Sequence, residues 1–222
     1  MPRVARLAAS ILSANFARLE DEVKRVEPYA DLIHVDVMDA HFVPPLTIGP
    51  VVVEWLRPVS DLPLHCHLMV EHPERLFADF AEAGTDLVTF HLEAVEDPGK
   101  VAAAARAAGM APGIGINPET DIRAAFPHLE GLDNVIVMTL ESTGYAGQPF
   151  QESSLRKVEA LRSEIDRRGL RVDVIVDGGI NEATGARCIE AGATMLAAAS
   201  SIFRADDPAR AAEGLARVAA GG

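Results

Sequence analysis

Histidine and aspartate residues stand at three places in the sequence where they could form one site. His34 and Asp36 lie two apart in His-Val-Asp-Val-Met-Asp, His67 lies in His-Cys-His-Leu-Met, and Asp177 precedes two glycines. Residues two apart in a strand point to the same face. Two imidazoles and two carboxylates together could hold a divalent ion such as zinc, iron, cobalt or manganese. A buried acid is costly unless it is paired or metal-bound, which favours this interpretation.

Eight short apolar runs could form the strands that position these residues. Most contain β-branched residues and many are bounded by Gly, Pro, Asp or Asn, which favours strands over buried helices. Between them lie amphipathic segments, of which 15–26, 73–83, 153–168 and 181–191 carry helix start or stop signals. The expected strands are 6–11, 32–37, 64–69, 87–92, 111–116, 134–140, 172–176 and 194–199.

Alternating strands and helices with short connections predict right-handed βαβ units and a parallel sheet. Eight units in 222 residues are about 28 residues each, near the compact end of the (β/α)8 TIM barrel. An open doubly wound sheet is the alternative, but it usually has a glycine-rich turn after its first strand. Here Leu-Ser-Ala-Asn follows the first run. We therefore expect one (β/α)8 barrel domain over residues 1–222.

The carboxyl ends of barrel strands face the active site, so the two histidines and two aspartates are expected to converge at the barrel mouth. His65 also faces inward, one pleat deeper, and we interpret it as a hydrogen-bonded core histidine rather than a fifth ligand. His91 is expected to form a hydrogen bond within the mouth. Cys66 should face the helices and Cys188 should lie on a helix, and both are interpreted as small packing residues.

Composition narrows the function classes. The chain has 33 acidic and 20 basic residues and a net charge of −13, which disfavours binding to nucleic acid or anionic membranes. No apolar run approaches the ~20 residues that span a bilayer, and the first ten residues lack the features of a signal peptide. Two cysteines cannot form a secreted disulfide framework. We expect a cytoplasmic protein, and a homo-oligomer because small barrels are commonly oligomeric.

Methionines and glycine-rich turns also stand at the expected strand ends. Met38, Met69 and Met138 could fill the core or form an apolar lid that excludes water from a metal. The chain has three lysines, none at an expected strand end, so backbone N–H groups would do much of the binding of a phosphate. The candidate segments are Gly144-Tyr145-Ala146-Gly147, Gly178-Gly179 and Ala199-Ser200-Ser201, the last of which could start a short helix.

Several segments, in this order, resemble the ribulose-phosphate 3-epimerase family. The similarity runs from about residue 8 to 203, and so many correctly spaced matches are specific. The segments are Ser-Ile-Leu-Ser-Ala-Asn-Phe (10–16), His-Val-Asp-Val-Met-Asp (34–39), His-Phe-Val-Pro (41–44), His-Leu-Met (67–69), Asn-Pro (117–118), Val-Met-Thr (137–139) and Val-Asp-Gly-Gly-Ile (176–180).

The resemblance implies a metal-dependent barrel enzyme that interconverts the sugar phosphates D-ribulose 5-phosphate and D-xylulose 5-phosphate without an organic cofactor. By matching position, His34, Asp36, His67 and Asp177 would bind the metal, and the two aspartates would act as acid and base. The residues that it places around the substrate are Ser10, His67, Met38, Met69, Met138, Gly144, Tyr145, Ala146, Gly147, Gly178, Gly179, Ala199 and Ser200.

This chemistry suits the residues. A proton on carbon 3, next to the carbonyl, is weakly acidic, and its removal gives an enediolate that a divalent cation can stabilise. Epimerisation takes a proton from one face of that carbon and returns one to the other. Two carboxylates on different strands can serve as base and acid, with their roles exchanged in the reverse direction.

The sequence departs from the family pattern mainly in its loops. The segment 141–148 is one residue longer than usual, Ala40 and Ala199 replace glycines, Pro45 replaces an asparagine and His65 an aspartate. The resemblance therefore predicts the type of reaction more firmly than it predicts the sugar substrate. The alternative is an epimerase of another ketose phosphate, such as D-allulose 6-phosphate. A non-catalytic sugar-phosphate-binding barrel would be expected to lack a metal ligand or acid/base residue. Decarboxylase barrels of this shape usually carry a central lysine, which is not expected here.

Overall fold

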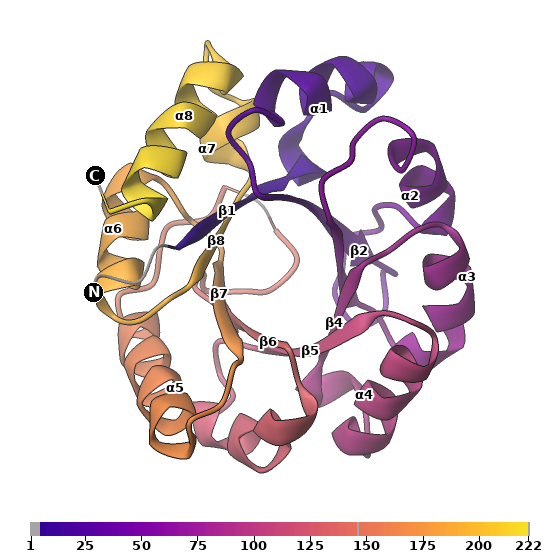
Figure 1. Ribbon diagram of the computed structural model, residues 1–222, viewed down its shortest axis with the longest axis vertical. Coiled ribbons are helices and arrows are strands. Elements are labelled where there is room, and N and C mark those ends of the chain that lie inside the picture. Colours follow the sequence, from indigo (N-terminus) through magenta and orange to yellow (C-terminus); the bar gives the residue numbers. More distant parts are fainter. Residues whose placement is uncertain (1–4, 146, 222) are drawn as a thin grey trace.

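A computed structural model describes residues 5–145 and 147–221. In these residues eight parallel strands close into a barrel in chain order, and helices surround it (Figure 1). The closed barrel confirms the expected fold and excludes the open doubly wound sheet. The strands are β1 (Arg6–Ser10), β2 (Leu32–Met38), β3 (Leu64–Met69), β4 (Leu87–His91), β5 (Ala111–Ile116), β6 (Asn134–Met138), β7 (Asp173–Asp177) and β8 (Met195–Ala198).

Helices follow the strands with the caps that the sequence indicates. Asn181 caps α6 (Glu182–Glu190) in a capping box with Thr184, and α5 (Ser154–Arg168) ends at Gly169 in the left-handed region. The other helices are α1 (Leu19–Val26), α2 (Pro50–Leu56), α3 (Phe77–Glu82), α4 (Pro98–Ala107), α7 (Ser200–Phe203) and α8 (Pro208–Ala219). In the parts of the chain described here, no helix is both long and apolar enough to cross a membrane.

Several connections are 3-10 turns. The expected helix at 15–26 begins as η2 (Phe16–Arg18), and the one at 73–83 begins as η3 (Pro73–Leu76). Between β5 and β6 the connection is η5 (Ile122–Gly131), which contains Pro127. Proline has no N–H to donate and clashes with an α-helical backbone, which explains the different helix type. The remaining short turns are η1 (Ile11–Ser13) and η4 (Leu92–Ala94).

The core has two apolar layers. One lies between the barrel and the helices, and it includes Cys66 and Cys188. The other fills the inside of the barrel, with Leu32, Ile136 and Met195 among its members. The two cysteines are buried and free, and burial raises the pKa of each thiol to about 12. Such thiols are inert at neutral pH, so their expected packing role is confirmed.

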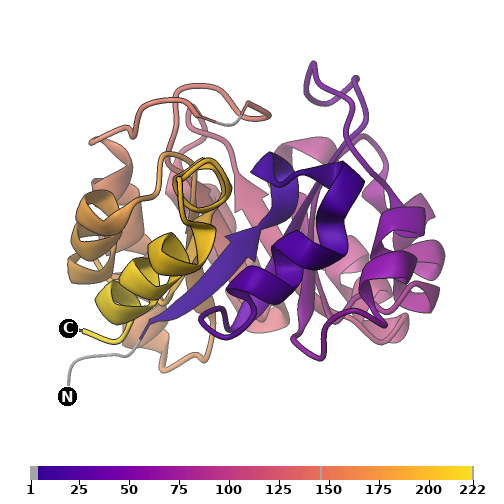
Figure 2. The same ribbon diagram turned by 90° about the horizontal axis from the view of Figure 1, so that it is seen from above.

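Strand register brings the polar residues together. In the β2–β3 pair, His34 lies beside His65 and Asp36 beside His67, and the β6–β7 pair places Met138 beside Asp177. Paired residues of parallel neighbours point to the same face of a sheet. Figure 2 shows that the loops after β2 and β6 rise from the same end of the barrel, which is the end where these strands finish.

Candidate active site

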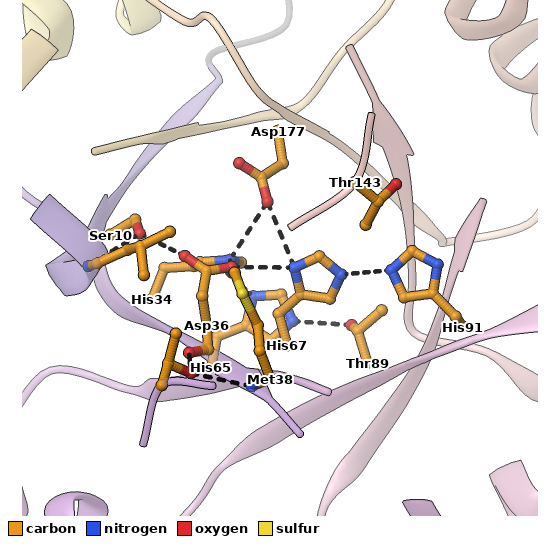
Figure 3. A network of polar contacts seen from close by, with 12 residues as sticks. Ser10, His34, Asp36, Met38, His65, His67, Thr89, His91, Thr143 and Asp177 are labelled. Carbon is orange, nitrogen blue, oxygen red and sulfur yellow. Dashed lines mark hydrogen bonds and ion pairs between the residues drawn. The ribbon is translucent and has the colours of Figure 1, made fainter. Parts of the chain in front are cut away.

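Four side chains from three strands meet at the barrel mouth. His34, Asp36, His67 and Asp177 each direct one possible ligand atom into a group whose members all lie within 4.8 Å of one another. His34 Nε2 is 3.2 Å from Asp36 Oδ1 and 3.7 Å from Asp177 Oδ2. His67 Nδ1 is 3.1 Å from Asp36 Oδ1 and 3.3 Å from Asp177 Oδ2. Figure 3 shows Asp177 facing both rings.

These separations suit a metal ion. Zinc binds nitrogen and oxygen ligands at 2.0–2.2 Å, and a tetrahedral arrangement with such bonds separates its ligand atoms by roughly 3.3–3.6 Å. The four nitrogen–oxygen distances, from 3.1 to 3.7 Å, surround that range. Nitrogen and carboxylate donors also suit iron, cobalt and manganese. The cluster therefore fits one divalent ion without rearrangement of the strands.

Opposite charges stabilise the cluster itself. Burial alone would lower the pKa of His34, but the charges of Asp36 and Asp177 outweigh it and raise the pKa to about 10. The pKa of His67 is raised for the same reason, against the effect of burial. Burial would raise the pKa of Asp36, yet the two imidazoles hold it well below its usual value. The histidines and aspartates thus favour each other's charged forms in the metal-free protein.

The two carboxylates differ in their surroundings. Asp36 Oδ2 accepts a 2.6 Å hydrogen bond from the Ser10 hydroxyl, and its other oxygen faces the two imidazoles, so this side chain is 4% exposed. The Asp177 side chain is 16% exposed. Asp36 is therefore the more buried of the two carboxylates, and Asp177 is the more accessible. Ser10 is buried, and its hydroxyl oxygen also accepts a 3.4 Å hydrogen bond from the Leu12 N–H.

Two more histidines support the cluster from behind. His91 Nε2 is 2.9 Å from His67 Nε2, which confirms a hydrogen-bonding role for His91 in the mouth. His65 Nδ1 lies 3.2 Å from His34 Nδ1, and its Nε2 lies 2.8 Å from the hydroxyl of Thr89. His65 is outside the four-residue group, so its interpretation as a hydrogen-bonded core histidine is also confirmed. Sequence reasoning missed that both rings contact the expected ligands.

A pocket opens above the cluster, and most of the residues expected around the substrate line it. Both aspartates form part of its wall, so groups that could move protons face the space where a small molecule would lie. Met38 and Met69 pack with Val43 at the mouth, whereas Met138 belongs to the barrel interior. The expected residues in its lining are Asp36, Met38, Met69, Met138, Gly144, Tyr145, Gly147, Asp177, Gly178, Gly179, Ala199 and Ser200. Of the other residues expected there, Ser10 and His67 are not among the described residues that line the pocket, and Ala146 lies outside the described residues.

Glycine allows the loops after β6 and β7 to approach each other. Gly179 has a φ of +66°, and a Cβ built on it would lie 2.8 Å from the backbone nitrogen of Phe150. The longer segment 141–148 is braced from within, because the Gln148 side chain donates to the carbonyls of Ser142 at 2.6 Å and Tyr145 at 3.0 Å. Described residues of all three expected phosphate-binding segments lie at the rim of the same pocket.

One basic residue near this rim could not be found from the sequence. Arg204 directly follows α7, and its Nη1 would be 3.8 Å from a Cβ built on Gly147. Its place depends on how the end of α7 meets the loop after β6, and the sequence gives no signal for that. Lys157, by contrast, donates to backbone carbonyls in the loop after β5.

The comparisons with known proteins agree with this geometry. The model of the ribulose-phosphate 3 epimerase family matches residues 6–203. The ribulose-phosphate 3-epimerase of Mycobacterium tuberculosis is 46% identical over 213 residues, which cover 96% of this chain and 92% of the relative. The enzyme of that name from Bacillus subtilis is 43% identical over 204 residues, covering 91% and 94%.

Solved structures support the fold. KGPDC from Streptococcus mutans superposes with a TM-score of 0.76 over 97% of both chains, at 21% identity. That similarity shows the same barrel architecture. The sequence matches go further, because they extend over nearly the whole chain and include the strands that carry the four clustered side chains. The chain therefore belongs to the ribulose-phosphate 3-epimerase family.

Proposed function

We propose that this protein is an isomerase that interconverts D-ribulose 5-phosphate and D-xylulose 5-phosphate by proton transfer at carbon 3. The observation that carries the proposal is the position of Asp36 and Asp177, which come from β2 and β7 and line one pocket. A single base returns its proton most easily to the face from which it came. Two carboxylates on separate strands can act on the two faces of one carbon, as inversion of that centre requires.

The chain's own residues supply binding, orientation and proton transfer. One aspartate accepts the carbon-3 proton while the other, protonated, donates to the opposite face, and the reverse reaction exchanges these roles. Ser10 orients the Asp36 carboxylate, and with His67 it is proposed to contact the sugar. Met38, Met69 and Met138 exclude water from the intermediate. A divalent ion held by His34, Asp36, His67 and Asp177 would stabilise the negative charge that develops on the substrate oxygens.

The sugar's phosphate is proposed to bind at the rim of the same pocket. The proposed donors are backbone N–H groups near Gly178, Gly179 and Ser200. Those of Gly144, Tyr145 and Gly147 are proposed as well, because these residues line the same pocket as the aspartates. Concave groups of backbone N–H groups are common anion sites. Arg204 lies beside this rim and would add one positive charge to a chain with few basic residues.

The finer assignments follow from the donor atoms and the composition. We propose one divalent ion, zinc, iron, cobalt or manganese, and no organic cofactor. We also propose a homo-oligomer in the cytoplasm that binds neither nucleic acid nor membranes. Elemental analysis of the purified protein would identify the metal, and sedimentation would give the oligomeric state.

The test is proton NMR in D₂O with metal-loaded protein and D-ribulose 5-phosphate. We expect the carbon-3 proton signal to disappear as D-xylulose 5-phosphate forms. The longer segment 141–148 favours one alternative, an epimerase for another ketose phosphate, so D-allulose 6-phosphate is included. Exchange with that sugar alone would support the alternative. No exchange with either sugar, with metal bound, would contradict the proposal and favour a non-catalytic binding protein.

A further inference from the structure

A chain of buried hydrogen bonds runs away from the cluster, through His65, and across the inside of the barrel. His34 Nδ1 lies 3.2 Å from His65 Nδ1, and His65 Nε2 lies 2.8 Å from Thr89 Oγ1. The Thr89 hydroxyl donates a 2.7 Å hydrogen bond to Asn134 Oδ1. All four side chains are fully buried, and they come from β2, β3, β4 and β6. Figure 3 shows His65 beneath the cluster, facing Thr89.

We propose that His65 is a positioning residue that fixes the tautomer of His34, so that His34 presents an unprotonated Nε2 to a metal ion. This inference rests on the metal site of the proposed function. It concerns a residue outside the four-residue group, and it gives a task to a ring that the proposed reaction does not otherwise use. The direction of these hydrogen bonds is set at the cluster and is matched at the opposite end of the hydrogen-bond chain.

The first end is the cluster. His34 turns Nε2 toward Asp36 and Asp177, and a nitrogen that binds a metal carries no proton. In the neutral imidazole the proton must then be on Nδ1, which faces His65. His65 must therefore accept at its own Nδ1. Its remaining proton lies on Nε2, where it can only donate to Thr89.

The second end is the side-chain amide of Asn134. Thr89 has one hydroxyl proton, which it gives to Asn134 Oδ1, so its oxygen is left to accept from His65 Nε2. Asn134 can occupy this place because residue 113 is glycine, and a Cβ there would lie 2.1 Å from Asn134 Oδ1. With Oδ1 turned to Thr89, an orientation that leaves Asn134 Nδ2 without a partner among the described residues, the hydrogen bonds run in the direction that the metal requires at the other end. Each ring nitrogen of His34 and His65 then has a single role: it binds the metal, donates a hydrogen bond or accepts one.

The two ligand histidines are supported differently. Behind His67, the ring of His91 is followed by the carboxylate of Glu93, with His91 Nδ1 3.4 Å from Glu93 Oε2. Behind His34, the series of hydrogen bonds ends on the neutral side-chain amide of Asn134. Groups that fix a ligand histidine through its second nitrogen typically contribute 10- to 100-fold to metal affinity. His65 does so here without adding a charge to the barrel interior.

Two substitutions separate positioning from core packing. In His65→Asn the amide oxygen is two bonds from Cβ, like Nδ1, so it can still accept from His34 but cannot reach Thr89. In His65→Gln the amide nitrogen is three bonds from Cβ, like Nε2, so it can donate to Thr89 but presents no acceptor at the Nδ1 position. Both side chains are polar and neutral. His65→Leu removes both hydrogen bonds and keeps an apolar volume.

The experiment measures zinc affinity by competition with a chromophoric chelator, using zinc alone and the full chain. Circular dichroism first confirms that each variant is folded. We expect zinc affinity to fall about 10- to 100-fold in His65→Leu and His65→Gln, and to stay within about threefold of wild type in His65→Asn. Equal affinity in all variants, or an equal loss in His65→Asn and His65→Gln, would overturn the positioning role.

A second measurement does not depend on variants that fold. Long-range ¹H–¹⁵N NMR of the zinc-loaded wild type should show His34 protonated at Nδ1 and His65 protonated at Nε2 only. A His34 ring protonated at Nε2, in protein that binds zinc, would overturn the inference and leave the metal site intact. Failure of the wild type to bind any of the four metals would instead overturn the metal site of the proposed function, and this inference with it.

Discussion

In the metal-free protein, the free energy of unfolding should fall as the pH rises from 7.5 to 9. His34 is the cause, because the charges of Asp36 and Asp177 overcome burial and raise its pKa from 6.5 to about 10. In the unfolded chain an imidazole with its ordinary pKa is neutral throughout this range. The native state then holds a proton that the unfolded state lacks. The stability from that proton is complete below about pH 6.5 and is lost as the pH approaches 10.

The size of the effect follows from the proton count. One additional proton in the native state gives a slope of about 1.4 kcal/mol per pH unit, so the interval corresponds to ~2 kcal/mol. The raised pKa of His67 acts in the same direction. So do the buried thiols of Cys66 and Cys188, once the unfolded thiols ionise near pH 9. Asp36 and Asp177, whose pKa values are lowered, are ionised in both states and contribute no slope.

Urea unfolding followed by circular dichroism, with a chelator present, measures this dependence. His34→Gln is the matched control, because it removes the titrating ring but keeps both thiols. Its loss of stability over the same interval should be smaller than that of wild type by ~2 kcal/mol. Saturating zinc should also remove the part of the fall that comes from His34, because a metal-bound nitrogen carries no proton. Equal pH dependence in wild type and variant would refute a protonated His34 in the metal-free fold.

Four further outcomes are expected. Asp177→Asn should lower the epimerisation rate by 10²-fold or more, about the contribution of a general acid or base, and a wild-type rate by NMR would rule out the two-carboxylate mechanism. His34→Ala should lower the metal content found by elemental analysis, and an unchanged content would remove it from the ligand set. Gly179→Ala should lower the free energy of unfolding by about 1–3 kcal/mol, as strained backbone typically costs, since its Cβ would meet Phe150; urea titration would detect this. Arg204→Gln should raise the KM for the sugar phosphate without changing the thermal midpoint, and an unchanged KM would exclude a phosphate contact.

Much of the fold and the four-residue cluster could be predicted because both depend on local pattern. The alternation of His34 with Asp36 sets which residues share a face, and the position of a strand end sets which side chains reach the mouth. These rules need neither the register nor the exact loop paths. The observed strand boundaries therefore differ from the expected ones by at most two residues, as at the end of β6, and these differences leave the site unchanged.

The interactions behind the cluster depend on register and packing. His65 could be placed in the core by its face alone, but its contact with His34 requires the pairing of β2 with β3, and a slip of one residue would turn it away. The position of Arg204 depends on how the end of α7 packs against the loop after β6. No helix was predicted at 122–131, where η5 forms, and Pro127 is the residue in this segment that disfavours an α-helix.

The two halves of the site are built from different parts of the molecule. His34, Asp36 and His67 are on strands, fully or nearly fully buried, and tied to further buried side chains, so the barrel itself fixes their geometry. The rim that would bind the sugar phosphate is built from loops, including the longer segment 141–148 and Ala199. Changes in the rim can therefore alter which sugar phosphate is held without moving the groups that transfer protons.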